Sequence, residues 1–545
     1  MQTTPVMAGL KERYPGVRIS LLVSSVFAEI CSYIPYIDRL FIFNTAGFEK
    51  MVSDGGPSLV GNFRYMERLL REINETEHDL TINFTHSTAS AVLTSLIKTK
   101  ELRGFSIDDE GHGLIRHPWI RYFFNVVPSR NYNPFHLCDL YIKAGGVMPE
   151  NKGLHLDVSE EAGGWVRSVL GENGISDEDL LIGFQLGASQ DNRRWPVSSF
   201  ARLADMMAET LGARFVLIGG NSEEKLGEEF ERLAEIKPVN FIGKTNLNEL
   251  AALLKRCNLL ISNDTGPLHI STAVGTKVIG IFLATAHFRE TGPYGDGHYV
   301  IEAAIPCSPC GFQVDCKELF CKDLITVTHL FELAKAAING RDIEDSPVWE
   351  KVQVYYSYFS EDGLLEYRPL LKRCIKENDF WSHNYRHTWQ WVLGGVNDYN
   401  IEGAYLNIVG KIKSWYSSGS LKHIFDPLKN TLTAFVRLKE LSEDGLNKMN
   451  LITEEVRSAT PNIEYIKERW EGVPFIDHEI EKIGHTQPPL YPMTLMFKYG
   501  KEGLEGENLS VLAEDTCNLY NDLRNHASMM IWFIERLVQA KSRES

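Results

Sequence analysis

The sequence predicts an α/β protein built on doubly wound parallel sheets, followed by a mostly helical C-terminal part. Short apolar runs alternate with segments of helical periodicity as far as about residue 340. Several of these runs lead directly into polar or glycine-containing loops, which is typical of strands in such sheets. After about residue 347 strand-like runs become rare, and seven of the ten tryptophans lie at or after Trp349.

The composition excludes several classes of protein. Of the 545 residues, 43% are hydrophobic and 23% are charged, so wholesale disorder, collagen and coiled coils are excluded. No apolar run reaches the length of a membrane-spanning helix, about 18 residues. Nine cysteines are too few for a disulfide scaffold, which favours a cytoplasmic protein. The net charge of −16 argues against broad nucleic-acid binding.

We expect residues 1–150 to form a first α/β domain with one parallel sheet. Apolar runs bounded by turn residues indicate strands at 18–25, 39–44 and 79–84. Residues 62–74 have helical spacing, and the alternation of strands with helices favours parallel pairing with covered faces. The turn-rich run at 143–153 marks the expected boundary.

A second domain is expected over 151–345, and a third, helical and of unknown role, over 350–545. Apolar runs in the second domain indicate strands at 180–189, 213–220, 258–264 and 277–282. Helical spacing indicates helices at 198–212, at 247–257 and from about Pro267 onward. This regular rhythm predicts a doubly wound sheet, whose ligands bind at the carboxyl ends of its strands.

The loop after the third strand of the second domain carries the first candidate site. In SNDTGPLHISTAVG a helix begins at about Pro267, whose missing N–H would have no helical partner anyway. Gly266 permits close approach of a ligand, and the first amides of the helix attract anions. Asp264, Thr265 and His269 could then bind phosphate or sugar hydroxyls. The alternative is that Asp264 or Thr265 merely caps the helix.

Two further loops follow neighbouring strands. In GASQDNRRWP, Ser189 and either Arg193 or Arg194 stand where a phosphate would lie, and arginine binds phosphate in a bidentate manner. Alternatively, this is a solvated loop that Trp195 anchors by packing. In GGNSEEK, Glu223 could accept hydrogen bonds from ribose hydroxyls, or it could simply favour a helix start.

Taken together, these loops resemble glycosyltransferase family 9, the ADP-heptose:lipopolysaccharide heptosyltransferases. The similarity rests on DTGPLHISTAVGTKVIGIF, LGASQDNRRWP, a later cysteine cluster and TTPVMAGLKERYPGVRISLLV, and it covers roughly residues 1–340. It implies a GT-B architecture, in which two Rossmann-like domains face each other across a cleft. The first domain would bind the acceptor, and the second would bind the nucleotide-sugar donor.

The resemblance implies an inverting transferase that needs neither a metal nor a cofactor. The donor would be ADP-heptose, and the acceptor a lipopolysaccharide-core or related lipid-linked glycan at the cytoplasmic face of the inner membrane. Arg193 stands where some members have lysine, which keeps the charge but changes the geometry. The alternatives are a transferase with another nucleotide-sugar or a non-catalytic nucleotide-sugar-binding protein. The residues whose positions match the family's donor-binding residues are Ser189, Arg193, Glu223, Asp264, Thr265, Gly266 and His269.

The chain departs from the family's pattern at its start. Members begin with a hydrophobic strand and a Gly-Asp loop, before the Thr-x-Pro segment found here at residues 3–5. The aspartate of that loop serves the family as general base. A parallel sheet without its first strand would also have unpaired edges. One interpretation is that further residues precede Met1. The other is a donor-binding relic with little transfer activity, and the catalytic base stays unknown.

Two clusters raise the question of a metal ion. Cys307, Cys310, Cys316 and Cys321 form a C-x2-C-x5-C-x4-C pattern, and four clustered thiolates can bind zinc. Structural zinc sites more often use two C-x2-C pairs, so thiols packed in a loop are the alternative. His383 and His387 are spaced like helical metal ligands, but aromatic neighbours such as Trp389 favour packing.

Residues 111–138 form a basic, aromatic-rich segment without any Asp or Glu. Arg116, Arg121 and Arg130 are interleaved with aromatic residues, and such a segment could contact an anionic glycolipid at the membrane surface. The alternative is that the aromatic residues belong to the core. The helical domain could bind a protein partner, cover the cleft or form oligomers, and the sequence does not choose between these roles.

Overall fold

The computed structural model describes residues 1–44, 58–312, 314, 316–395, 399–417, 422–506 and 508–544. The chain divides into two compact units, each built from two separate stretches of sequence. The first unit comprises Met1–Arg71 and Phe135–Leu371, and the second comprises Glu72–Pro134 and Lys372–Ser545. The sequence suggested three consecutive domains instead, because local periodicity does not report which distant segments pack together.

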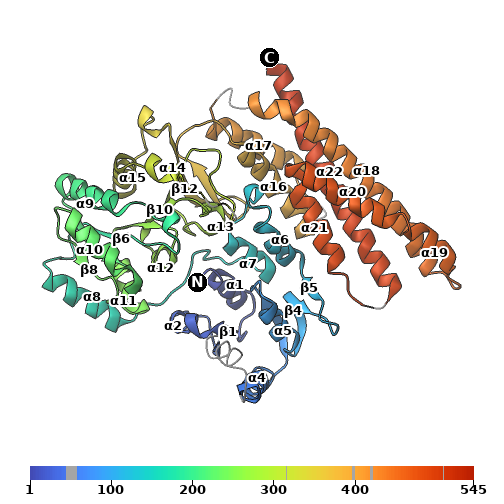
Figure 1. Cartoon of the computed structure of the whole chain (residues 1–545), viewed down its shortest axis with the longest axis horizontal. Helices are drawn as coiled ribbons and strands as arrows, with labels where there is room; N and C mark the ends of the chain where they lie inside the picture. The colour runs from blue at the N-terminus through green and yellow to red at the C-terminus, as the bar shows by residue number, and fades with distance from the viewer. Residues whose placement is uncertain are drawn as a thin grey trace. The chain divides into compact units, whose positions relative to one another are not determined.

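An eight-stranded sheet forms the centre of the first unit (Figure 1). Its strand order is β13-β12-β11-β10-β9-β6-β7-β8. The pairs from β11 to β8 are parallel, whereas β12 pairs antiparallel with both of its neighbours. The predicted doubly wound sheet is thereby confirmed. Its strands are β6 (Leu181–Gln185), β7 (Arg214–Ile218), β8 (Val239–Asn240), β9 (Leu259–Asn263), β10 (Lys277–Phe282), β11 (Tyr299–Ala303), β12 (Val352–Phe359) and β13 (Leu365–Pro369).

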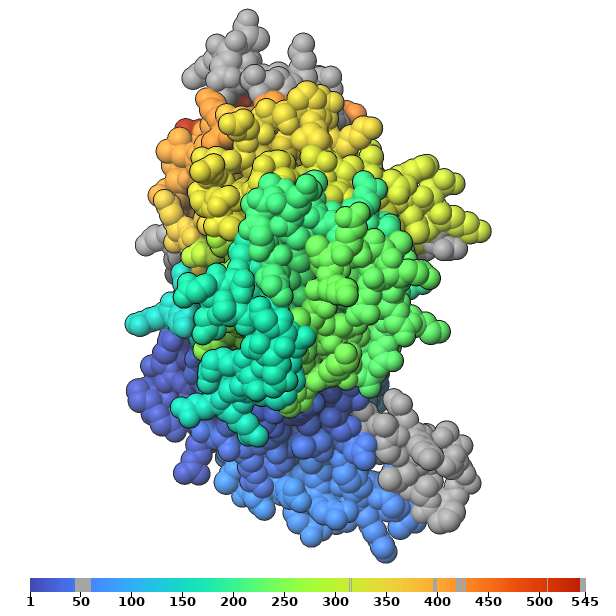
Figure 2. Space-filling model, turned by 90° about the vertical axis from the view of Figure 1, so that its left-hand side faces the viewer, coloured from blue at the N-terminus to red at the C-terminus, as the bar shows by residue number. Residues whose placement is uncertain are grey.

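Two groups of helices flank this sheet. Helices α9, α10 and α15 pack together, and so do α8, α11 and α12, as expected when helices cover both faces. Every residue of β6, β9 and β11 is accordingly buried. In Figure 2 the teal and green segment that carries α8 to α11 forms a continuous outer surface. The helices are α8 (Glu160–Glu172), α9 (Val197–Leu211), α10 (Glu224–Leu233), α11 (Leu247–Arg256), α12 (Gly266–Ala273), α13 (Phe288–Thr291), α14 (Phe320–Leu324) and α15 (Val327–Asn339).

The stretch predicted as helical from residue 350 begins with two strands instead. β12 and β13 form one edge of the eight-stranded sheet, with β12 paired to β11. The run VQVYYSYF consists largely of β-branched and aromatic residues, the types that favour strands. The sequence therefore contains a strand signal at 352–359. It was missed because helical periodicity dominates the residues that follow.

The predicted single sheet over residues 1–150 is wrong for the residues that the structure describes. β1 (Ser20–Ser24) pairs in parallel with β2 (Arg39–Phe43), and these strands form a sheet of two within the first unit. The third predicted strand belongs to a different sheet in the second unit. An apolar run predicts that a strand exists, but its partner is decided by tertiary structure. The helices of this region are α1 (Thr4–Arg13), α2 (Ala28–Cys31), α4 (Ser58–Ile73) and α7 (Leu137–Gly145).

The second unit combines a small sheet with a set of long helices (Figure 1). Its strands β3 (His78–Asn83), β4 (Thr99–Ile107) and β5 (Gly113–Arg116) form a three-stranded sheet, with α5 (Thr88–Ser95) and α6 (Pro118–Val126) beside it. No helix in the described ranges has the length and apolar character needed to cross a membrane. The helices that follow are α16 (Glu377–Gly394), α17 (Ile401–Trp415), α18 (Lys422–Val456), α19 (Ile463–Trp470), α20 (Val473–Thr486), α21 (Tyr491–Glu502) and α22 (Leu509–Glu544).

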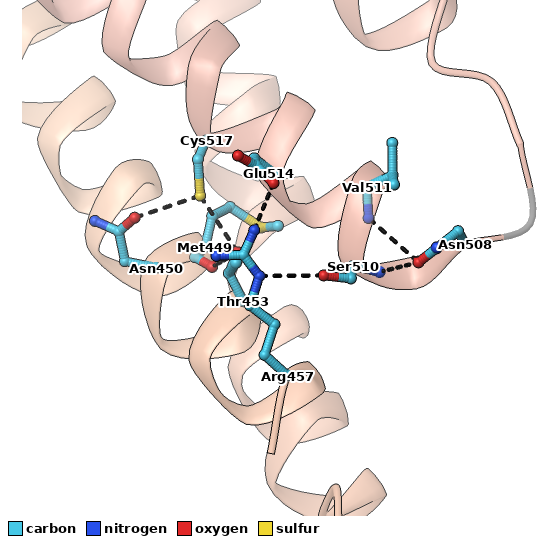
Figure 3. A network of polar contacts seen from close by, with 9 residues as sticks. All are labelled: Met449, Asn450, Thr453, Arg457, Asn508, Ser510, Val511, Glu514 and Cys517. Atoms are coloured by element: carbon cyan, nitrogen blue, oxygen red, sulfur yellow. Dashed lines mark hydrogen bonds and ion pairs between the residues drawn. The ribbon is translucent and has the colours of Figure 1, made fainter. Parts of the chain in front are cut away.

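Helices α18 and α22 pack along each other and are joined by polar side chains (Figure 3). Arg457, just past the end of α18, donates to Ser510 and Glu514 near the start of α22. Further along the pair, the Cys517 thiol contacts Asn450 and Thr453. The two helices are therefore antiparallel, and these polar pairs fix which residues lie opposite one another.

Candidate functional site

The eight-stranded sheet reverses its winding direction beside β6. From β6 the chain proceeds through β7 to β8, and it then returns to the other side of β6 with β9. Both neighbours run parallel to β6, so the loops that follow β6 and β9 leave the same edge of the sheet. In open α/β sheets, ligands bind at such reversal points. The predicted loops at 187–196 and 264–266 both start there.

Asn263, which sequence reasoning did not single out, joins these two loops. Its side chain is fully buried, and Nδ2 donates to the carbonyl oxygens of Leu186 at 3.0 Å and Gly187 at 3.1 Å. Its Oδ1 accepts the backbone N–H of Trp195 at 3.0 Å. The only sequence signal was a polar residue at the end of an apolar strand. Asn263 therefore sets the position of the β6 loop relative to β9.

Trp195 anchors the same loop by packing, as the alternative interpretation of this motif proposed. It is fully buried, its ring lies 4.9 Å from that of Phe200, and Nε1 donates to the carbonyl of Ile325 at 2.7 Å. The packing of Trp195 leaves the polar residues of the loop at the site and fixes the backbone that carries them.

The structure distinguishes between the two arginines of this loop. Arg193 Nη1 lies 3.8 Å from Asp264 Oδ2, and Arg193 Nε donates to Thr285 Oγ1 at 2.7 Å. Arg194 instead donates to the carbonyl of Ala188 and pairs with Asp191 at 2.8 Å. Arg193 is thus the arginine that lies beside the DTGP loop. Ser189 lies exposed in the same loop.

The start of α12 is not capped by a side chain. Thr265 holds the N-cap position, but Thr265 Oγ1 contacts the carbonyl of Asn263 and the hydroxyl of Ser262 rather than a helix amide. A Cβ added to Gly266 would meet nothing within 4 Å, so a ligand can approach the backbone there. The expectation that the Thr265 side chain caps this helix is therefore wrong. The Leu268 N–H donates to the Thr265 carbonyl at 3.2 Å, and no N-cap side chain accepts from the start of α12, which therefore keeps the positive end of its dipole open to an anion.

His269, one turn into α12, presents a neutral imidazole. Burial lowers its pKa to about 4, so the ring carries no proton charge near neutral pH. Its Nδ1 is buried and has no hydrogen-bond partner in the described part of the chain. A buried polar atom of this kind is costly unless a partner arrives. His269 can therefore offer one hydrogen bond to a neutral or anionic ligand.

Glu223 links the end of β6 to the loop after β7 by hydrogen bonds. Its two carboxylate oxygens accept from Gln185 Nε2 at 3.0 and 3.1 Å, and Oε2 also accepts the Gly220 N–H at 2.9 Å. A Cβ on residue 187 would lie 1.4 Å from Glu223 Oε1, so any residue larger than glycine would collide with this carboxylate. A carboxylate offers about four acceptor positions. Glu223 therefore has a structural role and keeps little capacity for a ribose.

Sequence comparison assigns one segment of the chain to a known family. Residues 66–319 match the sequence profile described as glycosyltransferase family 9 (heptosyltransferase). The chain carries a family 9 glycosyltransferase domain. The resemblance inferred from the DTGPLH and GASQDNRRWP motifs is thereby confirmed.

Two sequence relatives agree with this assignment. Lipopolysaccharide heptosyltransferase 3 of Escherichia coli is 26% identical over 288 residues, 52% of this chain and 79% of the relative. Lipopolysaccharide core heptosyltransferase OpsX of Haemophilus influenzae is 24% identical over 297 residues, covering 53% and 77%. A solved family 9 structure from Veillonella parvula has 27% identity and a TM-score of 0.44, covering 54% of this chain and 79% of that one. Both sequence relatives are heptosyltransferases, and the family 9 domain is accordingly a glycosyltransferase enzyme domain.

His136 forms a second buried imidazole in the first unit. Its Nδ1 accepts the backbone N–H of Cys138 at 3.1 Å, so Nε2 carries the proton and donates to the Gly292 carbonyl at 3.0 Å. Burial lowers its pKa to about 3, and that of His298 to about 4. These rings are neutral in the folded protein and titrate near their ordinary pKa only after unfolding.

The buried histidines predict a loss of stability in mild acid. Their pKa values are lower in the folded than in the unfolded state, so the unfolded chain binds more protons between pH 6.5 and 4. The free energy of unfolding should therefore fall as pH decreases through this window. Each histidine contributes up to about 1.4 kcal/mol per pH unit. Urea unfolding at several pH values should give a shallower dependence for His136→Gln, and an unchanged slope would contradict this explanation.

The cysteine cluster is one of the two candidate metal sites. Within the ranges that the structure describes, no group of three or more His, Cys, Asp or Glu side chains could hold a metal ion. Cys321 is buried, whereas Cys307 is exposed. The metal hypothesis for Cys307, Cys310, Cys316 and Cys321 stays a prediction, which no metal-binding group among the described residues supports.

The histidines of α16 bind neighbouring side chains rather than a metal. His383 Nε2 lies 2.9 Å from the hydroxyl of Tyr416. His387 lies 2.9 Å from the Tyr399 hydroxyl and 3.2 Å from Asn407 Oδ1. The packing interpretation of the WSHNYRH motif is therefore confirmed.

The arginines of the predicted membrane-facing segment are engaged within the second unit. Arg130 is only 6% exposed. Arg116 pairs with Glu505 at 2.6 Å, and burial lowers the pKa of Arg121, which lies beside Asp522. These contacts contradict the hypothesis that Arg116, Arg121 and Arg130 together face an anionic glycolipid.

The aromatic residues of the same segment hold the helical part in place. Trp119 and Tyr122 are buried, and the Tyr122 ring lies 5.2 Å from that of Trp389 in α16. Asn125 Nδ2 donates to the carbonyl of Pro492, at the start of α21, at 2.8 Å. The core interpretation of these aromatic residues is confirmed. They pack against helices that lie far away in the sequence, and local patterns could not show that.

Proposed function

We propose that the family 9 domain transfers a heptose from ADP-heptose to a lipopolysaccharide-core or related glycan, with inversion at the anomeric carbon and without a metal ion. The observation that carries this proposal is the Arg193 guanidinium beside the uncapped start of α12, at the reversal point of the sheet. A guanidinium and a helix N-terminus both favour a diphosphate. The relatives named as heptosyltransferases support the choice of sugar.

Each donor-site residue has a chemical task in this proposal. Arg193 and the first amides of α12 bind the diphosphate, with Gly266 permitting the close approach. Asp264 accepts hydrogen bonds from sugar hydroxyls, and His269 offers one more from a neutral ring. Thr265 and Ser189 contribute hydroxyl groups near the diphosphate, and Glu223 contacts the ribose with its remaining acceptor position.

The proposed reaction forms one bond and breaks another at the anomeric carbon. The acceptor oxygen attacks from the face opposite the diphosphate, the bond from that carbon to the diphosphate breaks, and ADP leaves with the electron pair. Arg193 and the dipole of α12 stabilise the negative charge that develops on the diphosphate. The acceptor hydroxyl also loses a proton to a base, which we do not assign to a residue of this chain.

The acceptor in this proposal is attached to a lipid. Such an acceptor would bring the reaction to the cytoplasmic face of the inner membrane. The membrane association would then come from the substrate, since Arg116, Arg121 and Arg130 are engaged within the protein.

Thermal unfolding with ADP, UDP, GDP or CMP at millimolar concentration tests the donor. A ligand at about 100 times its Kd stabilises the protein by about 2.7 kcal/mol. We expect ADP to raise Tm more than the other nucleotides. Stabilisation by a different nucleotide would keep the transferase and change the donor. No shift with any nucleotide would contradict the proposal, and nucleotide binding without transfer to an acceptor would favour a non-catalytic binding protein.

A further inference from the structure

A loop outside the predicted donor motifs contacts both charged residues of the site. It follows β10 and runs through residues 283–291. Thr285 Oγ1 accepts the hydrogen bond from Arg193 Nε at 2.7 Å, and Thr291 Oγ1 donates to Asp264 Oδ1 at 3.3 Å. The loop thus gives one neutral hydroxyl partner to each member of the charged pair.

The charged pair itself is held open. Arg193 Nη1 lies 3.8 Å from Asp264 Oδ2, whereas a charge-assisted hydrogen bond closes to about 2.7–2.9 Å. The two side chains are only 16% and 12% exposed, so their attraction is stronger than it would be in water. In the described part of the chain, the Arg193 side chain makes a single hydrogen bond, which is the bond from Nε to Thr285. Its Nη atoms therefore remain available as donors.

The loop has a fixed backbone. The ring of Phe288 is fully buried and packs against Phe282. The carbonyl of His287 accepts the Thr291 N–H at 3.1 Å, and the carbonyl of Ala284 accepts a backbone N–H at 2.8 Å. The two threonine hydroxyls are consequently presented from a rigid frame. They can hold Arg193 and Asp264 in place instead of following them.

We propose that Thr285 and Thr291 are positioning residues that keep Arg193 and Asp264 from closing into a tight ion pair. This inference rests on the proposed function, because the ligand that benefits is the diphosphate of the donor. A tight pair would have to open before a diphosphate could bind, and the cost of opening would weaken binding. With the pair held apart, the Nη donors of Arg193 meet the diphosphate without that cost.

The double variant T285V/T291V tests the inference, because valine keeps the shape of threonine and removes the hydroxyl. Isothermal titration with ADP and with inorganic pyrophosphate should show Kd values about tenfold higher for each ligand, the effect of about one lost hydrogen bond. In transfer assays the KM for the donor should rise, while the KM for the acceptor stays unchanged. The variant T285S/T291S should bind like the wild type. T210V is a matched control, since Thr210 lies exposed on α9 and its hydroxyl donates to the Met206 carbonyl of the same helix.

The outcomes separate this inference from the proposed function. If the wild type binds ADP and the valine variant binds it equally well, the positioning role is wrong while the donor assignment stands. If the serine variant is as weak as the valine variant, the hydroxyls are not the cause and the inference fails. If the wild type binds neither ADP nor pyrophosphate, both proposals are wrong. Weak binding by the valine variant with recovery in the serine variant supports the inference.

Discussion

Replacing Arg193 with alanine is expected to lower kcat/KM for heptosyl transfer by about 10²–10³-fold, the effect of losing one charge-stabilising donor. The guanidinium lies beside Asp264, which precedes the start of α12, and in the proposed reaction the leaving diphosphate develops negative charge there. Removing it also leaves less positive charge between the Asp264 carboxylate and the diphosphate. The measurement is a transfer assay that follows the release of ADP.

Two further substitutions make this prediction specific. Arg193→Lys keeps the charge but loses the planar fork and the Nε bond to Thr285, so its activity should fall between those of wild type and Arg193→Ala. Arg194→Ala is the matched control, because Arg194 bonds Ala188 and Asp191 of its own loop. Equal losses for the Arg193 and Arg194 alanine variants would show that the loop matters only as a whole.

Asn263→Leu is expected to have the largest effect on the stability of the first unit. Leucine has a similar size but leaves two carbonyl oxygens and the Trp195 N–H buried without partners. With about 1–3 kcal/mol for each unpaired buried group, a total loss of about 3 kcal/mol or more is expected. Urea unfolding measures it, and ADP binding should weaken as well, because the β6 loop that carries Arg193 is released.

Asn221→Leu provides the comparison for this substitution. Asn221 lies exposed in the loop after β7 of the same unit, so the same change of side chain should leave the unfolding midpoint nearly unaltered. If Asn263→Leu unfolds at the same urea concentration as the wild type, the hydrogen bonds of Asn263 do not hold the two loops together. Another contact would then have to link the ends of β6 and β9.

The local sequence was sufficient for the strands and loops of residues 180–282. Each apolar run in 180–282 is a strand, because a strand buried on both faces must be apolar throughout. The motifs placed Asp264 and Arg193 at the correct edge, since in a parallel sheet every carboxyl end faces one side. Even so, the choice between Arg193 and Arg194 needed the folded structure. Arg193 ends a short 3-10 turn and Arg194 follows in an extended conformation, and the sequence does not say which of the two side chains faces the site.

Other features depended on contacts between distant residues. Thr285 and Thr291 enter the site because β10 pairs with β9, and nothing in their own segment marks them as partners of Arg193 and Asp264. Asn263 likewise gained its role from the neighbouring strand. These hydrogen bonds join side chains to groups that only strand pairing brings within reach.

The sequence by itself determined the α/β class, the helical C-terminal part and the family 9 motifs, because periodicity and loop chemistry are local properties. Only the tertiary structure decided that the first strands form two sheets, and that β12 belongs to the eight-stranded sheet. It also decided that Tyr122 packs against Trp389 of α16 and that Asn125 bonds the carbonyl of Pro492 in α21. An amphipathic or aromatic pattern shows that a surface must be covered. What covers it is settled by the free energy of the whole fold, in which distant segments compete for the same apolar face.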